Sequence, residues 1–343
     1  MKRLPGAPGL PIAGAALLLF ALALASLALG SVALAPADVF QALFGRGEPA
    51  SAAAGSIVRL VRVPRTLTAA GAGAALGMAG LAMQTVFRNA LAGPGVLGVT
   101  SGAGLGVALV LLTGVGGSLP GLSAVAAMTG AAGVMFLALL VNRMVEEPVF
   151  LLVLGLLFGY AASSVTTLLM ASTAAEGLQR YIVWSFGSFA LPPGAVPWLL
   201  VAVSAVMTAG LAVAGPRIDA MLLGAHYAES SGVHARRMQG MLIATAGGLA
   251  GLVTAFTGPI VFLGVAVPHI ARGVLRGSRH RSLAIMTALC GAVLGLGADL
   301  VARLPGSERA LPLNAVTALL GVPVVIAVVV RARAAGGRGG MGL

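Results

Sequence analysis

Residues 62–106 read RVPRTLTAAGAGAALGMAGLAMQTVFRNALAGPGVLGVTSGAGLG. The stretch opens with the basic sequence Arg-Val-Pro-Arg and continues with about twenty small and apolar residues, enough for a helix to cross a bilayer. A polar hinge at residues 88–94 then leads directly into a second apolar run that is rich in glycine. The pattern predicts two membrane-spanning helices that are joined by a short turn.

The rest of the chain has the same character. Of its 343 residues, 59% are hydrophobic and only 9% are charged, and the mean hydropathy is +1.03. A soluble domain carries about 25% charged residues, so the composition indicates an all-α, polytopic membrane protein. The net charge of +12 comes from residues between apolar runs, which is typical of orientation signals and not of nucleic-acid binding. The single Cys290 excludes an intrachain disulfide.

Ten apolar runs predict ten membrane spans. They cover residues 10–35, 66–87, 96–114, 122–141, 149–171, 195–214, 238–257, 260–275, 283–301 and 313–330. The first run is too long for the core of a signal peptide, so we interpret it as a retained helix. Fourteen of the 21 Lys and Arg residues fall on the side of the N-terminus, which predicts that both termini are cytoplasmic.

The segments between the spans are short. Residues 37–65 form the longest predicted outer loop, and the apolar spacing within 36–44 favours a short interfacial helix there. Residues 176–190 predict a second outer helix, with aromatic residues at the membrane interface. We expect a single permease domain over residues 1–333, followed by a glycine-rich, disordered tail at 334–343.

Glycines four residues apart recur in five of the runs. The steps are Gly73/Gly77, Gly98/Gly102/Gly106, Gly155/Gly159, Gly247/Gly251 and Gly291/Gly295. Such steps allow neighbouring helix backbones to approach closely. They are compatible with static packing and also with surfaces that slide between two states.

The sequence offers little for catalysis or for metal binding. It contains no HExxH, CxxC, Walker or nucleophile-elbow motif, and we expect no catalytic residue, metal site or cofactor in this chain. His226, His234 and His280 fall in predicted inner loops, which favours solvated surface positions. For His269, which follows Pro268, a hydrogen bond to a neighbouring segment is favoured over metal binding, because no second ligand lies at helical spacing.

The placement of charged residues argues against a self-powered carrier. Every Asp and Glu falls at a predicted helix end or in a loop, whereas a proton-driven transporter is expected to keep such groups in mid-membrane. Asp299 and Arg303 stand four apart, which suits an ion pair within one helix. Arg59, Arg62 and Arg65 cluster on the predicted outer side, where orientation does not explain them.

An internal segment suggests a partner that supplies the energy. Residues 219–233 place apolar side chains at 221–223 and 227 within a polar loop. A short helix with an apolar tip fits a groove on a cytoplasmic protein. The alternative is a surface helix that lies on the membrane.

Four blocks of sequence carry a resemblance to a known family. They are residues 62–67, 84–98, 258–272 and 298–323, in that order. From the first span to about residue 331, the chain resembles the permease family of bacterial ABC importers for iron-siderophores, haem and cobalamin (FecCD-type, type II importers). This resemblance implies a homodimeric permease of about ten helices in the bacterial cytoplasmic membrane. The expected partners are two cytoplasmic ATPase subunits, which bind ATP and Mg²⁺, and an external substrate-binding protein.

The expected cargo is an iron-siderophore or haem-type metal chelate, and cobalamin import within the same family is the alternative. A stand-alone secondary transporter is the alternative from a different class. Hydrolysis of ATP would be carried out by the separate subunit, so this chain itself is not expected to be an enzyme.

The resemblance also implies roles for particular residues. Arg62, Arg65 and Arg303 match positions that dock the binding protein; Met221, Leu222, Leu223, Gly224, Ala225, His226 and Glu229 match the ATPase-coupling loop; Asn89, Leu91, Glu147 and Pro148 match the inner gate. The chain departs from the family pattern at three places. Ala225-His226 replaces a common acidic position, Ala90 and Gly93 alter the hinge, and Glu147-Pro148 stands where small polar residues are frequent.

Overall fold

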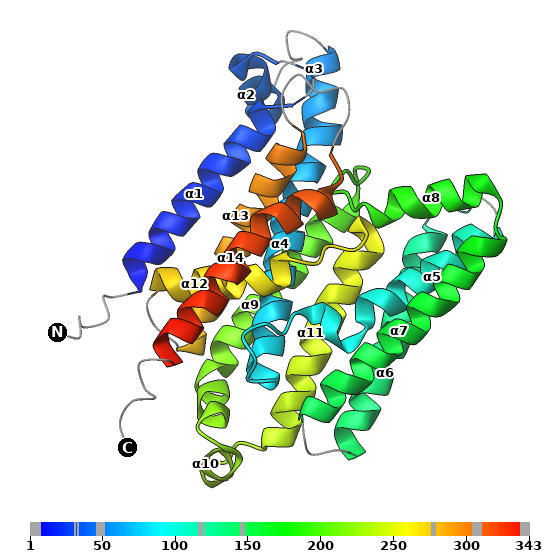
Figure 1. Ribbon diagram of the computed structural model, residues 1–343. Helices are drawn as coiled ribbons and strands as arrows, with labels where there is room; N and C mark the ends of the chain where they lie inside the picture. The colour runs from blue at the N-terminus through cyan, green and yellow to red at the C-terminus, as the bar shows by residue number, and fades with distance from the viewer. Residues whose placement is uncertain are drawn as a thin grey trace.

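The computed structural model describes residues 8–30, 32, 34–45, 52–115, 119, 121–144, 148–275, 279–303 and 311–336. These residues form helices and short connections without a β-strand, as the all-α prediction requires (Figure 1). The helices are α1 (Gly9–Ala28), α2 (Pro36–Phe44), α3 (Ala52–Ile57), α4 (Val63–Val86), α5 (Val99–Thr113), α6 (Leu122–Met144), α7 (Pro148–Ser172), α8 (Ala175–Ser185), α9 (Ala195–Leu222), α10 (Ala225–Ser230), α11 (Ala235–Thr257), α12 (Leu263–Leu275), α13 (His280–Ala302) and α14 (Leu313–Gly336). A π-helical turn, Val58–Arg62, joins α3 to α4, and a 3-10 turn, Pro94–Leu97, precedes α5.

Ten of these helices correspond one to one with the ten predicted spans. Seven are long and apolar enough to cross a membrane, and α5, α12 and the apolar part of α14 are shorter apolar helices. The first span is shorter than predicted, because α1 ends at Ala28 and Leu29 adopts an extended conformation. At the other end of the chain, α14 continues to Gly336, three residues into the predicted tail, and residues 337–343 lie outside the described part.

Helix α4 lies at the centre of the molecule (Figure 1). It packs against α9, α11, α12 and α13, and 20 of its 24 residues are buried. Glycine makes these contacts close: a Cβ added at Gly73 would lie 2.2 Å from the carbonyl oxygen of Gly291 on α13. The steps Gly73/Gly77 and Gly291/Gly295 therefore lie where α4 and α13 pack closely, as the pattern predicts.

The prediction of an outer loop over residues 37–65 is wrong in its second half. Helix α2 forms as expected, but a helix also begins at Ala52 and passes through the π-helical turn into α4, giving an apolar helical segment Ala53–Val86 of 34 residues. Pro64 does not interrupt it. Proline lacks the N–H that closes the helical ladder, and it stands in the first turn of α4, directly after a turn where the ladder is already irregular.

The two ends of the molecule are distinct in Figure 1. Helices α2, α3 and α8 lie at one end, which we call the α2 end. Helix α10, the first residues of α1 and the last residues of α14 lie at the opposite end, which we call the α10 end. The first and last described helices therefore start and finish on the same side, as an even number of spans requires.

The contact between α4 and α12 gives a test of this packing. A Cβ added at Gly80 would lie 1.6 Å from the backbone oxygen of Gly264, so Gly80→Ala is expected to lower the free energy of unfolding by about 1–3 kcal/mol or more. Gly297→Ala on α13 is the matched control, because an added Cβ there meets no atom within 4 Å. Unfolding of both variants in detergent micelles checks the difference, and equal stability of the two would contradict the observed helix contact.

Candidate functional site

The α10 end carries an exposed apolar tip, formed by the last turn of α9 and by α10. Leu223 is 70% exposed, and Leu222 and Tyr227 are exposed as well, whereas Met221 is buried. Apolar side chains at the polar end of a membrane protein are available to a partner that offers a groove. Three of the four apolar positions in the predicted docking segment are thus free to make contacts.

The other predicted coupling residues occupy the turn and the short helix. Gly224 turns the chain with a φ of 124°, and Glu229 is exposed on α10. Ala225 and His226 belong to α10, but their side chains lie outside the described part of the structure. The roles of these residues in ATPase coupling remain predictions.

The hinge between α4 and α5 also lies toward the α10 end and is held by hydrogen bonds. Asn89 Oδ1 accepts from the backbone N–H of Leu91 at 2.9 Å, which closes a tight turn. His269 Nε2 donates to the carbonyl oxygen of Ala90 at 2.6 Å, so the prediction of a hydrogen bond to a neighbouring segment is confirmed. The hinge is therefore attached to α12 by a specific contact.

The opposite side of the predicted inner gate is only partly described. Glu147 lies outside the described residues, and Pro148 begins α7 without a described side chain. Asn89 and Leu91 are exposed, as gate residues need to be. Their role at a gate stays a prediction.

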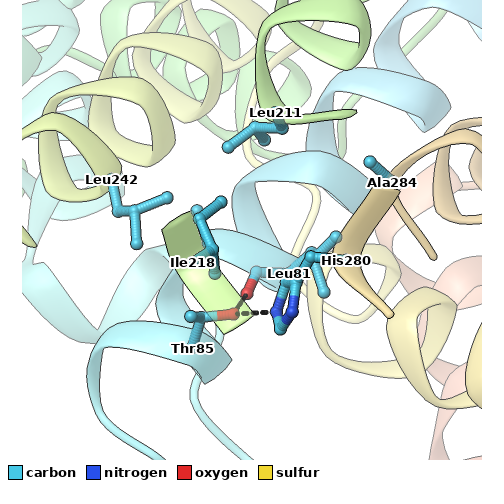
Figure 2. A pocket seen from close by; sticks show the side chains of 8 residues that line it. Leu81, Thr85, Leu211, Ile218, Leu242, His280 and Ala284 are labelled. Carbon is cyan, nitrogen blue, oxygen red and sulfur yellow. Dashed lines mark hydrogen bonds between the residues drawn. The ribbon is translucent and has the colours of Figure 1, made fainter. Parts of the chain in front are cut away.

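His280 is not a solvated surface residue, and that prediction is wrong. It is the first residue of α13, three positions before the predicted start of the span, and its side chain is 6% exposed. Figure 2 shows its ring beside Thr85 and below the apolar side chains of Leu211, Ile218 and Leu242. Its contact with Asp219, 61 residues away, could not be found by helical spacing.

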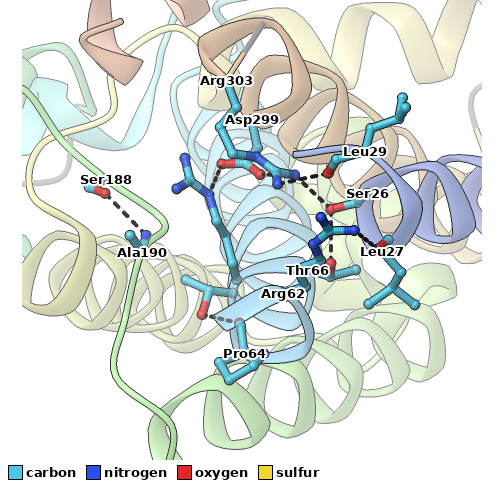
Figure 3. A network of polar contacts seen from close by, with 12 residues as sticks. Ser26, Leu27, Leu29, Arg62, Pro64, Thr66, Ser188, Ala190, Asp299 and Arg303 are labelled. Atoms are coloured by element: carbon cyan, nitrogen blue, oxygen red, sulfur yellow. Dashed lines mark hydrogen bonds and ion pairs between the residues drawn. The ribbon is translucent and has the colours of Figure 1, made fainter. Parts of the chain in front are cut away.

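At the α2 end, Asp299 lies at the centre of a buried charge cluster (Figure 3). Its side chain is 1% exposed; Oδ1 accepts from Arg65 Nε at 2.8 Å, and Oδ2 lies 2.8 Å from Arg303 Nη2. The predicted pair of Asp299 and Arg303 is confirmed. Arg65 joins it from α4, 234 residues away in sequence, which no local pattern could show.

The cluster holds more positive than negative charge. Two guanidinium groups share one carboxylate, and Arg303 also donates to Ser26 Oγ at 3.0 Å and to the carbonyl oxygen of Leu29 at 3.3 Å. Arg303 Nε is buried without a hydrogen-bond partner among the described residues. Burial lowers the pKa of Arg303 from its ordinary value, while Asp299 acts in the opposite direction. The cluster therefore carries one positive charge more than its single carboxylate neutralises.

Arg62 has a different environment from the one that its predicted docking role assumes. It is 3% exposed and donates from Nη1 to the carbonyl oxygens of Leu27 and Ala28, at 2.6 and 2.8 Å, and from Nη2 to that of Val32. The last carbonyls of a helix lack partners within it, and a cation near them is favourable. Arg62 therefore fastens the end of α1 to the α3–α4 segment and is buried, although the resemblance places it among the residues that dock the binding protein.

A groove lined by hydroxyl groups runs between α5, α7 and α8. It consists of two adjoining cavities of about 220 and about 300 Å³ that share Ser101 and Ser163. Thr100, Thr166, Tyr181 and Ser185 add further hydroxyls to the larger cavity. Because unsatisfied polar groups are costly against hydrocarbon, such a groove fits contact with water, a ligand or another subunit better than contact with lipid.

The described residues contain no group of three His, Cys, Asp or Glu side chains placed to hold a metal ion. The described residues thus form an exposed apolar tip, a hinge, a charge cluster and a groove, distributed over a bundle of apolar helices. The sequence model of the FecCD transport family matches residues 17–331. The chain belongs to the FecCD transport family. It is the permease subunit of an ABC importer, and its apolar helices are membrane spans.

Individual relatives of this FecCD permease agree over most of its length. It is 35% identical over 280 residues to the vitamin B12 import system permease protein BtuC of Vibrio cholerae, covering 79% of this chain and 82% of the relative. It is 34% identical over 292 residues to BtuC of Klebsiella pneumoniae, covering 84% and 87%. A solved inward-facing structure of a transporter assigned to the metal-chelate ABC type superposes with a TM-score of 0.81 at 28% identity, covering 93% of this chain and 98% of that one.

Proposed function

We propose that this FecCD permease imports a cobalamin-type metal chelate across the bacterial cytoplasmic membrane. The observation that carries the proposal is its similarity to vitamin B12 permeases over about four-fifths of the chain, with 35% identity to the Vibrio cholerae protein. The similarity to a metal-chelate type transporter supports the broader class of cargo. The similarity to the vitamin B12 permeases favours cobalamin over an iron-siderophore or haem, which are other metal-chelate cargoes.

The working assembly in this proposal contains two copies of the permease, two cytoplasmic ATPase subunits and an external binding protein. ATP and Mg²⁺ are bound by the ATPase subunits, and the permease itself needs no cofactor. The α10 end faces the cytoplasm, because the exposed tip of Leu222, Leu223 and Tyr227 suits the ATPase there. Both termini then lie in the cytoplasm, and the Asp299 cluster faces the binding protein.

In this proposal, the groove between α5, α7 and α8 forms part of the route that the substrate follows. The side-chain hydroxyls of Thr100, Ser101 and Ser163 make no hydrogen bond within the part of the chain that the structure describes, so they are available to a passing ligand. Hydroxyl groups bond amide and carbonyl oxygens of a cargo without the strong attraction of a charged side chain. A route of this kind holds a large chelate weakly enough to release it.

Uptake into proteoliposomes tests the cargo. Vesicles that contain the permease and its ATPase, supplied with the binding protein and internal ATP, are expected to accumulate labelled cyanocobalamin well above a ferric hydroxamate siderophore or haem. All three ligands are offered at the same concentration, and vesicles without the permease are the control. Preferential uptake of the siderophore or of haem would overturn the assignment to cobalamin and leave the importer class intact.

A further inference from the structure

His280 connects three helices at the α10 end. Its Nδ1 lies 2.6 Å from Asp219 Oδ1 at the end of α9, and its Nε2 lies 3.1 Å from Thr85 Oγ1 in the last turn of α4 (Figure 2). The backbone N–H of His280 also donates to Asp219 Oδ1, at 3.2 Å. Because a carboxylate only accepts hydrogen bonds, Nδ1 is the donor in the contact with Asp219.

The surroundings of His280 make these contacts difficult to replace. Leu81, Ile218 and Leu242 pack around the ring, and the space that they line is too small for a water molecule. A polar group that loses its partner in such a place stays unsatisfied, which costs about 1–3 kcal/mol. The His280 ring and Thr85 are therefore shielded from water, whereas the Asp219 side chain at the end of α9 is 37% exposed.

A second contact joins the ends of α4 and α9, two to three residues further along each segment. Arg88, the first hinge residue, donates from Nη2 to the carbonyl oxygen of Met221 at 2.9 Å. Its backbone has a φ of 46°, a conformation that side-chain-bearing residues adopt rarely and that surrounding contacts must maintain. Met221 directly precedes Leu222 and Leu223, the exposed residues of the docking tip.

The position of these contacts suggests what they do. Asp219 and Met221 make the last of these hydrogen bonds on α9 before the tip. On the other side, Thr85 lies in the last turn of α4 and Arg88 is the first residue of the hinge. Any displacement of the tip must therefore pull on the hinge side of α4 and on the start of α13, unless these hydrogen bonds break. Coupling between distant sites needs such a physically continuous connection between rigid elements.

We propose that Thr85, Arg88, Asp219 and His280 form a coupling clamp that transmits movement of the ATPase-docked tip into α4 and α13. The clamp residues touch neither cargo nor nucleotide; they are positioning residues for transport. The inference rests on the proposed function, since it assumes an ATPase at the tip. It extends that function by naming the residues that convert ATP hydrolysis into movement of the membrane helices.

The clamp is tested by the number of cargo molecules transported per ATP hydrolysed, in proteoliposomes that hold the complete complex. His280→Ala removes both side-chain contacts and leaves only the backbone N–H that donates to Asp219. Thr85→Val removes the contact with His280 together with the local hydrogen bond from the Thr85 hydroxyl to the carbonyl oxygen of Leu81. Asp219→Asn keeps an acceptor oxygen for His280. We expect His280→Ala to lower the ratio by about two- to thirtyfold, Thr85→Val to lower it less, and Asp219→Asn to keep most of it. ATPase affinity for the permease and the ATP hydrolysis rate should stay near wild type in all three.

Ser282→Ala is the matched control, because its hydroxyl bonds only to the nearby carbonyl of Arg279 at the start of the same helix. A wild-type ratio in both His280→Ala and Thr85→Val would overturn the clamp. A lower ratio that is accompanied by an equal loss of bound ATPase would overturn it too. That result would show that the four residues only stabilise the docking surface. If wild-type vesicles fail to transport with ATP at all, the proposed function fails and not the clamp alone.

Discussion

Asp299→Ala is expected to lower the free energy of unfolding by about 3–5 kcal/mol, as removal of one partner from a buried ion pair usually does. Asp299 is completely buried and is the carboxylate shared by Arg65 and Arg303. Without it, two guanidinium groups remain largely desolvated and have no counter-charge in the cluster. Denaturation in detergent micelles, followed by helix signal, measures the loss.

The exposed pair of Glu176 and Arg180 on α8 provides the control for that prediction. It has the same four-residue spacing and a shorter separation, 2.6 Å, but both side chains are more than half exposed. Glu176→Ala should therefore change the free energy of unfolding by only about 0–1 kcal/mol. If both alanine variants lose similar amounts, burial is not what makes the Asp299 cluster important.

Arg65→Gln is expected to weaken association with the binding protein by about tenfold to a thousandfold at low ionic strength. Arg65 is 15% exposed in its side chain, and only its Nε is occupied by Asp299, so the rest of the guanidinium can meet an acidic partner. The glutamine keeps an amide for Asp299 and avoids placing a second carboxylate beside it. Titration of labelled binding protein against the permease in nanodiscs, at several salt concentrations, measures the effect.

Arg62→Gln separates docking from structural support. Its buried guanidinium donates three hydrogen bonds to carbonyl oxygens at and just after the end of α1, so the substitution should reduce stability and leave the salt dependence of association unchanged. An Arg65 variant with wild-type affinity at low salt, or an Arg62 variant that loses the salt dependence, would contradict the assignment of docking to Arg65 and support to Arg62.

The spans could be predicted from sequence because apolar length is a local property. The ten runs recur as ten helices, and even the short α2 has its predicted bounds. The sequence pattern does not predict the helical segment over residues 52–65, because Pro64 and several arginines are typical of a loop. Arg62 is buried because α1 ends beside it and offers carbonyl oxygens. That contact joins residues more than 30 positions apart, so local sequence patterns do not predict it.

The contacts of the site depended even more on tertiary structure. The pair of Asp299 and Arg303 follows from four-residue spacing, but Arg65 reaches the same carboxylate from a distant helix. His280 was misplaced because the predicted span started three residues too late, which turned a buried helix start into a loop. One sequence signal points to this contact: Asp219 follows the apolar run 195–214 closely, and His280 precedes the apolar run 283–301 closely.

The most direct test of the central claim is the energy source of transport. Proteoliposomes that contain the permease, its ATPase and the binding protein should take up cobalamin when ATP is present and should show no uptake with ATP omitted. Vesicles that contain the permease alone should show no uptake under an imposed proton gradient. Accumulation driven by the proton gradient without the ATPase would contradict the account and identify a secondary transporter.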